Sequence, residues 1–258
     1  IPLWLKVSSK GLAPGTYTAI FYLKGSKKGF QDQQIKLNVT VKPVDLAGIH
    51  VDSTMFQEQL QRNPSPEMLD FLCEGGCNII YRSCVGAWAI DDYPLADEQG
   101  NIIEPANYDQ WDFIIEEYIK RGIGKERIRL LLWLELPIHG LRRNQKIMFP
   151  FNSEKWNKVF RQWILDFTAH FKEKYGFTDR QIVFYPVDEP SGDINDPKSS
   201  IYSALLQAKI IKSANPNFVT LINPLPDFIK TFAENQELQN QVLPYFDILE
   251  LYRPGVTP

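Results

Sequence analysis

The first part of the chain alternates apolar and polar side chains in the manner of half-buried β-strands. Between residues 35 and 41, Ile, Leu and Val occupy every second position, so one face of this segment is apolar and the other is polar. Two further strand-like runs, 3–7 and 16–23, come before it, with the turn signal Ala13-Pro14-Gly15 between them. We therefore expect antiparallel β-structure over residues 1–43, in a segment too small to fold alone.

After residue 43 the pattern changes to short apolar runs that alternate with helical segments. Ser65-Pro66, Asn107 and Ser153 are helix-start signals. The helix from Ser153 is amphipathic, because its apolar residues recur every three or four positions: Trp156, Val159, Phe160, Trp163, Ile164, Phe167 and Phe171. Further helices are expected over about 200–213 and 227–233. The apolar runs that we expect to be strands are 46–51, 78–81, 128–136, 181–187, 218–222 and 247–251.

These strands are too apolar to be buried on one side only, which favours a parallel sheet covered by helices. No Gly-rich phosphate loop follows the first of them, and this weakens a nucleotide-binding interpretation. The predicted fold is α/β, a (β/α)8-type TIM barrel over residues 44–258. It would be truncated after about six strands. The chain opens within strand-like sequence and without an initiator Met, so we expect it to be a piece of a longer protein.

Composition narrows the possible partners and cofactors. The net charge of −3 offers no basic surface for nucleic acid, and no apolar run approaches the roughly 20 residues that cross a membrane. The cysteines are too few and too irregularly spaced for a disulfide framework, and neither they nor the scattered histidines have zinc-ligand spacing. We expect no metal and no cofactor. The residues concerned are Cys73, Cys77, Cys84, His50, His139 and His170.

Two adjacent acids stand out at the end of the run 181–187. Asp188 and Glu189 follow it directly, and Pro190 stops the strand. Catalytic groups of α/β proteins lie at the carboxyl ends of strands, and a pair of acids there suggests glycoside hydrolysis. Successive residues of a strand point to opposite faces, so both acids can serve one pocket only if the chain twists at Asp188-Glu189. The alternative is a structural role, in which the Asp caps a loop and the Glu makes an ion pair.

The order of these features resembles glycoside hydrolase family 123 and relatives of unassigned function. The resemblance depends on Pro2-Leu3-Trp4-Leu5-Lys6-Val7 and Ala13-Pro14-Gly15-Thr16-Tyr17-Thr18, followed by Asp188-Glu189-Pro190 at the fourth barrel strand. It extends over nearly all of this chain, which supplies only part of such a protein. It implies that residues 1–43 are the tail of an antiparallel β-sandwich domain. The sixth strand departs from the family's usual pattern, which favours Trp where Glu250 or Tyr252 stands.

The resemblance also implies an activity. The enzyme would be a β-N-acetylhexosaminidase that releases terminal N-acetylhexosamine, chiefly N-acetylgalactosamine, from glycans with help from the substrate's own acetamido group. Glu189 would be the general acid/base. Asp188 would hold the acetamido N–H and stabilise the oxazolinium ion. We expect a glycan partner and a secreted, periplasmic or cell-surface location.

Other polar and aromatic residues follow the predicted strands and are candidates for substrate binding. Trp133 could form the floor of a sugar subsite, and Tyr252 could bind the acetamido oxygen. Arg82 and Asp52 could instead form a structural ion pair, and each candidate has a packing role as its alternative. The full set is Asp52, Arg82, Trp133, Glu135, Asn223 and Tyr252.

Two other functions remain open from the sequence. A conventional retaining glycosidase would use Glu189 as acid/base and a glutamate nucleophile from a later strand about 5–5.5 Å away. Such enzymes generally carry Asn before the acid, so Asp188 speaks against this mechanism. A non-catalytic carbohydrate-binding module could also retain the fold. Carboxylates held by Arg or backbone donors would favour the binding module, whereas carboxylates that converge on an open, Trp-lined hollow would favour the enzyme.

Overall fold

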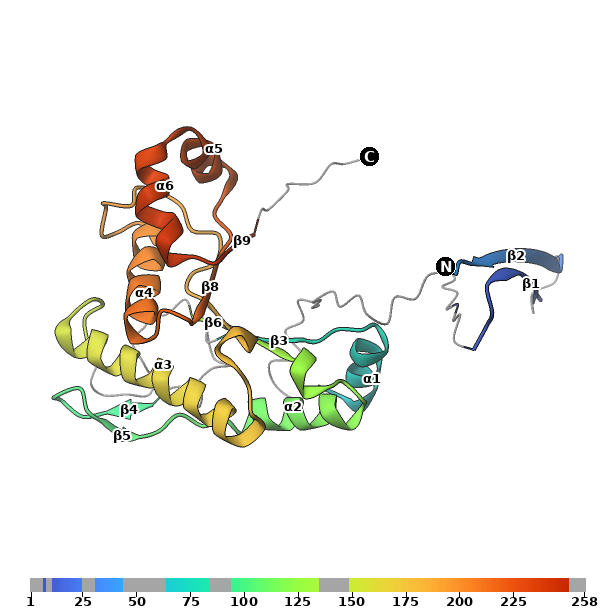
Figure 1. Ribbon diagram of the computed structural model, residues 1–258, viewed down its shortest axis with the longest axis horizontal. Helices are drawn as coiled ribbons and strands as arrows, with labels where there is room; N and C mark the ends of the chain where they lie inside the picture. Colours follow the sequence, from blue (N-terminus) through green and yellow to red (C-terminus); the bar gives the residue numbers. More distant parts are fainter. Residues whose placement is uncertain are drawn as a thin grey trace. The chain divides into compact units, whose positions relative to one another are not determined.

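Contacts within the chain divide it into two units, residues 1–51 and 52–258. The computed structural model describes residue 7 and the ranges 11–24, 31–43, 64–83, 94–134 and 149–250. The predicted domain boundary after residue 43 stays a prediction, because residues 44–63 lie outside the described part. Figure 1 traces both units in sequence colours.

The first unit contains an antiparallel pair of strands, β1 (Gly15–Leu23) and β2 (Gln33–Val41). Thr18 Oγ1 donates a hydrogen bond of 2.8 Å to Asn38 Oδ1 across the pair, one of the cross-strand contacts that stabilise such ribbons. These strands confirm the runs predicted at 16–23 and 35–41. The predicted run 3–7 lies outside the described residues except for Val7, and the β-sandwich stays a prediction.

The second unit is built on a five-stranded parallel sheet whose spatial order follows the sequence. Consecutive parallel neighbours joined by helices are the arrangement of a (β/α) barrel, so the predicted fold class is confirmed. The first predicted strand, 46–51, lies outside the described residues. The strands are β3 (Ile79–Ser83), β6 (Arg129–Trp133), β7 (Ile182–Tyr185), β8 (Val219–Ile222) and β9 (Ile248–Leu249).

The helices begin close to the predicted start signals. Ser65 Oγ accepts a hydrogen bond from the Met68 N–H at 3.3 Å, and Ser153 Oγ accepts one from the Trp156 N–H at 3.2 Å, which are N-cap contacts. The helix predicted to start at Asn107 begins at Asp109 instead. The helices are α1 (Pro66–Glu74), α2 (Asp109–Lys120), α3 (Glu154–Tyr175), α4 (Ser200–Ala214), α5 (Pro226–Glu234) and α6 (Gln236–Val242).

One helix and two short strands of the second unit were not predicted from the sequence. The helix α6 is short and mostly polar, so it lacks a clear apolar period. The strands β4 (Leu95–Ala96) and β5 (Ile102–Glu104) form a small antiparallel pair, and segments of this length carry too few positions to reveal an alternation.

The two faces of the parallel sheet are both apolar and belong to two separate clusters of apolar side chains. One face contacts α1, α2 and α3 in the main core, through side chains such as Ile80, Leu132 and Phe184. We call the opposite face the inner face. It carries Ile79, Tyr81, Leu131, Trp133, Val183, Tyr185 and Leu221. Burial on both sides explains why the strands are continuous apolar runs rather than alternating ones.

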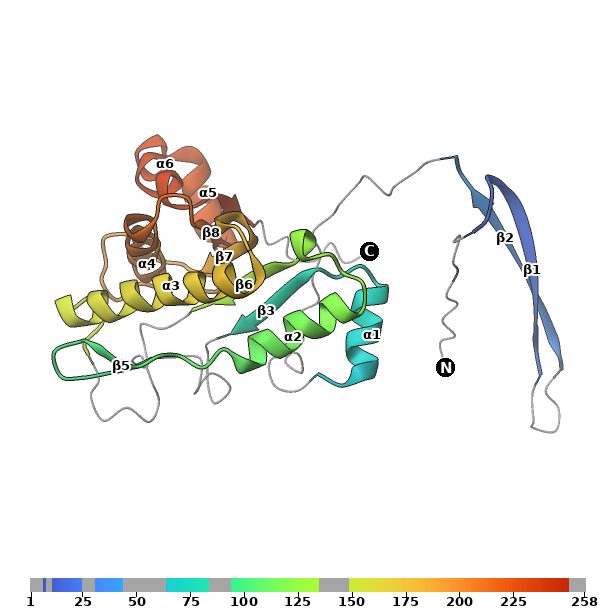
Figure 2. The same cartoon turned by 60° about the horizontal axis from the view of Figure 1, so that its bottom comes forward.

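The helix α3 supplies much of the main core, as its apolar period predicts. All seven predicted core positions of this helix are buried, and Figure 2 shows the C-terminal end of α3 next to α2. The helix ends at Gly176, whose φ of 76° is the left-handed conformation that suits a glycine C-cap. No helix in the described ranges combines the length and the apolar composition needed to cross a membrane.

A buried carboxylate joins α2 to α3. Asp112 is only 8% exposed, and it accepts hydrogen bonds from Lys174 Nζ at 2.8 Å and Tyr175 Oη at 3.0 Å, with His170 Nε2 3.0 Å away. Burial by itself would raise the pKa of Asp112, but the hydrogen bonds from Lys174, His170 and Tyr175 outweigh it and lower the pKa. His170 is therefore part of a structural contact between helices.

We expect Asp112→Asn to lower the free energy of unfolding by about 1–3 kcal/mol at pH 7, since the variant leaves buried donors poorly paired. The lowered pKa means that this stabilisation is complete above the unfolded value near 4 and is lost as the pH falls through the folded value. Urea unfolding at pH 7 and at pH 3 measures both effects. Asp109→Asn, at an exposed acid of the same helix, is the control. Equal losses in the two variants would contradict the assignment.

Candidate functional site

The chain changes direction where the two acids stand. The strand β7 ends at Tyr185, and Glu189 adopts a φ of 45°, a left-handed conformation that is uncommon for a residue other than glycine. The twist that both acids need in order to serve one pocket is therefore present. Asp188 is half-buried and Glu189 is exposed, so neither acid is sealed inside the core.

Asn223 braces both acids from the neighbouring strand. It follows β8 and is buried; its Nδ2 donates to Asp188 Oδ1 at 3.1 Å, and its Oδ1 accepts from the Glu189 backbone N–H at 2.9 Å. One side chain thereby fixes the carboxylate of the first acid and the backbone of the second. The sequence predicted Asn223 as a substrate-binding residue, which stays a prediction; the structure shows that it also holds the two acids in place.

Tyr185 is a second brace, which the sequence analysis did not single out. Its hydroxyl donates a hydrogen bond to Asp188 Oδ1. Burial, and then this hydrogen bond to Asp188, raise the pKa of Tyr185 far above its ordinary value, so the phenol stays a donor. The period-2 alternation of the strand could have identified it, because Tyr185 shares the inner face with Val183.

The remaining carboxylate oxygens of the two acids lack a hydrogen-bond donor among the described residues. Within this part of the chain, Asp188 Oδ2 and the Glu189 carboxylate accept no hydrogen bond. Asp188 is thus a carboxylate held at one oxygen and available at the other, a geometry suited to receiving a donor from a ligand. Glu189 projects beside it on a fixed backbone.

Trp133 lies in an aromatic row on the inner face of the sheet. Its ring stacks between Tyr81 and Tyr185, with centroid separations of 6.0 and 6.1 Å. Among the described residues its Nε1–H is buried and has no hydrogen-bond partner. Because Tyr185 also bonds Asp188, this row connects the predicted aromatic residue to the acids.

Arg82 does not join this group. It is 3% exposed, and its guanidinium carbon lies 5.5 Å from the ring centroid of Trp111 in α2. Alternation along β3 explains the placement, since Tyr81 takes the inner face and Arg82 therefore points toward the helices. The predicted candidates Asp52, Glu135 and Tyr252 lie outside the described residues.

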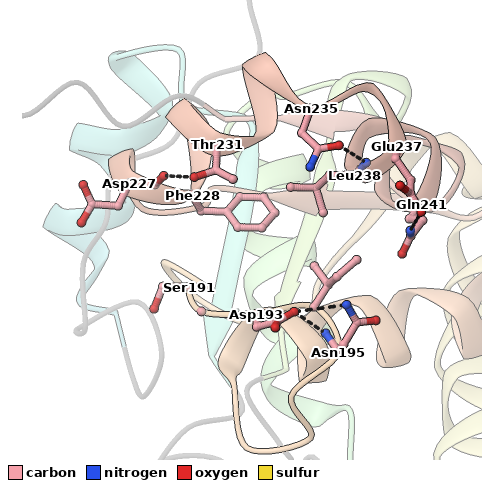
Figure 3. A pocket seen from close by; sticks show the side chains of 12 residues that line it. Ser191, Asp193, Asn195, Asp227, Phe228, Thr231, Asn235, Glu237, Leu238 and Gln241 are labelled. Atoms are coloured by element: carbon pink, nitrogen blue, oxygen red, sulfur yellow. Dashed lines mark hydrogen bonds between the residues drawn. The ribbon is translucent and has the colours of Figure 1, made fainter.

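A cavity of about 640 Å³ opens beyond the acids, between the loop that starts at Ser191 and the helices α5 and α6. Figure 3 shows Phe228 and Leu238 on one side of it, with Asp193 and Asn195 on the other. The loop that borders it passes through Gly192, where φ is +96° and a Cβ atom would meet Ser199 Cβ at 2.8 Å, so only glycine fits. Neither Asp188 nor Glu189 lines this cavity.

The described cysteines have the character of structural thiols. Cys77 is buried and Cys73 is partly buried, and both are free. Burial raises the pKa of Cys73 to about 11, which disfavours a reactive thiolate. Over the described ranges, no group of three or more His, Cys, Asp and Glu side chains is placed to hold a metal ion.

The chain is similar to solved structures of several glycoside hydrolases. The GH53 catalytic domain of Ignisphaera aggregans is 18% identical, with a TM-score of 0.42, over 72% of this chain and 51% of that one. An intracellular xylanase of Thermoanaerobacterium saccharolyticum, in complex with xylotriose, is 14% identical, with a TM-score of 0.43, over 72% and 61%. A GH10 xylanase with a bacterial Ig-like domain, from termite gut, is 13% identical, with a TM-score of 0.42, over 86% and 51%.

This chain thus spans about half the length of the solved structures it matches. No protein-family profile matches it, and no curated protein is significantly similar to it. Membership of glycoside hydrolase family 123 therefore stays a prediction.

We expect Asn223→Ala to leave the Glu189 N–H and Asp188 Oδ1 each without a partner, and to lower the free energy of unfolding by about 1–3 kcal/mol. Amide hydrogen exchange at Glu189 should quicken in this variant. Asn217→Ala, at the opposite end of β8 and exposed, is the matched control and should change neither quantity. An unchanged Glu189 exchange rate in Asn223→Ala would show that the brace is absent.

Proposed function

We propose that this chain carries the catalytic acids of a glycoside hydrolase that releases terminal N-acetylhexosamine by substrate-assisted retaining catalysis. N-acetylgalactosamine is the first sugar to test. The supporting observation is the pair of acids at the carboxyl edge of the parallel sheet. Asp188 is held at Oδ1, no described residue donates to its Oδ2, and Glu189 is exposed beside it. This edge is where barrel enzymes carry their active sites.

In the first step Glu189, as the acid, gives its proton to the glycosidic oxygen as the bond from C1 to that oxygen breaks. The carbonyl oxygen of the 2-acetamido group attacks C1 and forms a cyclic oxazolinium ion. Asp188 Oδ2 accepts the acetamido N–H and offsets the positive charge, an electrostatic contribution that depends on its fixed position. Tyr185 and Asn223 supply that fixation from the other oxygen.

In the second step water attacks C1 while the Glu189 carboxylate takes a proton from it. The bond between C1 and the acetamido oxygen breaks, which restores the acetamido group and the protonated acid. The two displacements at C1 leave the configuration retained. No carboxylate on the far face of the sugar is needed, which distinguishes this route from the two-carboxylate scheme.

The contacts of Asp188 differ from those expected of a binding module, because a phenol and an amide side chain bind it at one oxygen, and neither is an Arg or a backbone donor. The other expectation for an enzyme, acids that converge on an open, Trp-lined hollow, stays a prediction, since neither acid lines the cavity beside Ser191. Within the described residues no donor reaches the Glu189 carboxylate. Secretion, or a periplasmic or cell-surface location, is part of the proposal, and so is a glycan partner.

Glu189→Gln should lower kcat for an aryl N-acetylhexosaminide by about 10²–10⁴-fold, the usual contribution of a general acid. The loss should be largest for poor leaving groups, because these depend most on protonation. Glu234→Gln, at an exposed residue near the end of α5, is the control for the loss of one acid. The assay uses the full-length protein, and unchanged turnover in Glu189→Gln would remove Glu189 from its role.

Asp188→Asn should slow 2-acetamido substrates by roughly 10²-fold or more, since an amide cannot offset the oxazolinium charge. Substrates with a 2-hydroxyl group test the mechanism, because they have no acetamido N–H to hold. We expect the variant to lose activity selectively on the 2-acetamido members of a panel of aryl glycosides. An equal loss on both kinds of substrate would exclude substrate assistance and favour a conventional retaining glycosidase.

A further inference from the structure

A third acid, Glu250, reaches the same edge of the sheet from β9. In the parallel pair of β8 and β9, Leu221 is opposite Ile248 and Ile222 is opposite Leu249. The backbone N–H of Glu250 donates to Ile222 O at 2.8 Å, so the ladder continues one residue past the assigned strand. Glu250 therefore takes the position beside Asn223, which follows Ile222.

Strand alternation determines which way Glu250 points. Opposed residues of parallel strands share a face, and successive residues change face. Leu221 belongs to the inner face, whereas Ile222 packs toward α5 and α6. Leu249 shares the side of Ile222, where both border an apolar hollow with Phe228. Glu250 must then return to the inner side, the side from which Asn223 bonds Asp188.

The charges of the neighbouring groups agree with this placement. Partial burial, and then the nearby charge of Asp188, raise the pKa of Glu250 above its ordinary value. Glu250 in turn is among the charges that raise the pKa of Tyr185. Within the described residues, the titratable groups facing Glu250 are thus Asp188 and Tyr185, both from the β7 segment, while Asn223 of β8 is uncharged.

We infer that Glu250 belongs to the candidate site as a third carboxylate, whose charge acts on Asp188 across Asn223. This inference rests on the proposed function and adds a residue that the family resemblance does not supply. The charge of Asp188 disfavours ionisation of Glu250, because like charges repel. When it is ionised, Glu250 adds negative potential where the oxazolinium cation forms.

The first experiment does not depend on activity. Carbon-13 NMR of the side-chain carboxyls follows the titration of Glu250 in the wild type and in Asp188→Asn. We expect the Glu250 midpoint to fall by roughly half a pH unit in the variant, the size of a charge interaction over several ångströms at the surface. Asp193→Asn, at an exposed acid of the nearby loop, should leave the midpoint in place. An unchanged midpoint in Asp188→Asn would overturn the inference.

The second experiment compares kcat/KM on a 2-acetamido substrate and on a 2-hydroxyl substrate. In Glu250→Gln we expect a severalfold loss on the 2-acetamido substrate alone, because less negative potential surrounds the oxazolinium ion, and this loss should be far smaller than in Glu189→Gln. An unchanged rate on the 2-acetamido substrate would overturn the inference. Loss of turnover on every substrate, with a mechanism-based 2-fluoro sugar attached at position 250 in the wild type, would also overturn it by making Glu250 the nucleophile.

The two readouts keep the inference separate from the proposed function. If the wild-type protein hydrolyses no aryl glycoside, the proposed function fails, while the NMR titration still decides whether Glu250 and Asp188 are coupled. If the wild type is active and the Glu250 midpoint is the same in Asp188→Asn, the proposed hydrolase function is kept and the inference about Glu250 is rejected.

Discussion

The candidate site depends on one side-chain amide that spans two strand ends. Asn223, at the exit of β8, gives its N–H to the Asp188 carboxylate and takes the backbone N–H of Glu189. The left-handed backbone at Glu189 is strained for a residue with a side chain, and the second of these bonds secures it. Without this amide, two adjacent acids after a strand would point to opposite sides. With it, one is a fixed carboxylate with an open oxygen, and the other is an exposed acid beside it.

Parallel β-structure explains how the remaining parts reach that place. Opposed residues on neighbouring strands share a face, so Tyr185 on β7 lies next to Trp133 on β6, and Trp133 lies next to Tyr81 on β3. The same rule carries Glu250 to the side of Asn223 and sends Arg82 to Trp111. The main core, filled by α3 and α2, holds the sheet from the opposite side. The register of the strands therefore determines which side chains meet at the candidate site. In barrel enzymes, the loops beyond the strand ends determine which substrate is bound.

The sequence predicted the elements with strong periods and predicted the site in part. The sequence predicted the apolar stripe of α3, the Ser65 and Ser153 caps and five parallel strands. Burial of one helix face leaves a period of three to four residues, and burial of both faces of a strand leaves a continuous apolar run. From the sequence, a twist at Asp188-Glu189 was only the condition for both acids to serve one pocket, and the φ of 45° at Glu189 meets that condition. Arg82 was named as a candidate without regard to strand alternation, which turns it toward Trp111. Tyr185 was not singled out, because it lies within the continuous apolar run that ends at Val187. The cavity beside Ser191 depends on α6, whose short polar sequence shows no such period.

In the proposed mechanism, Asp188 receives the acetamido group and Glu189 faces the leaving oxygen. The most direct test is a crystal structure of the full-length protein with a thiazoline mimic of the oxazolinium intermediate. We expect the ring nitrogen within hydrogen-bond distance of Asp188 Oδ2, and Glu189 on the side of the departing oxygen. A mimic bound in the cavity lined by Phe228 and Asp193, with both acids untouched, would contradict the account.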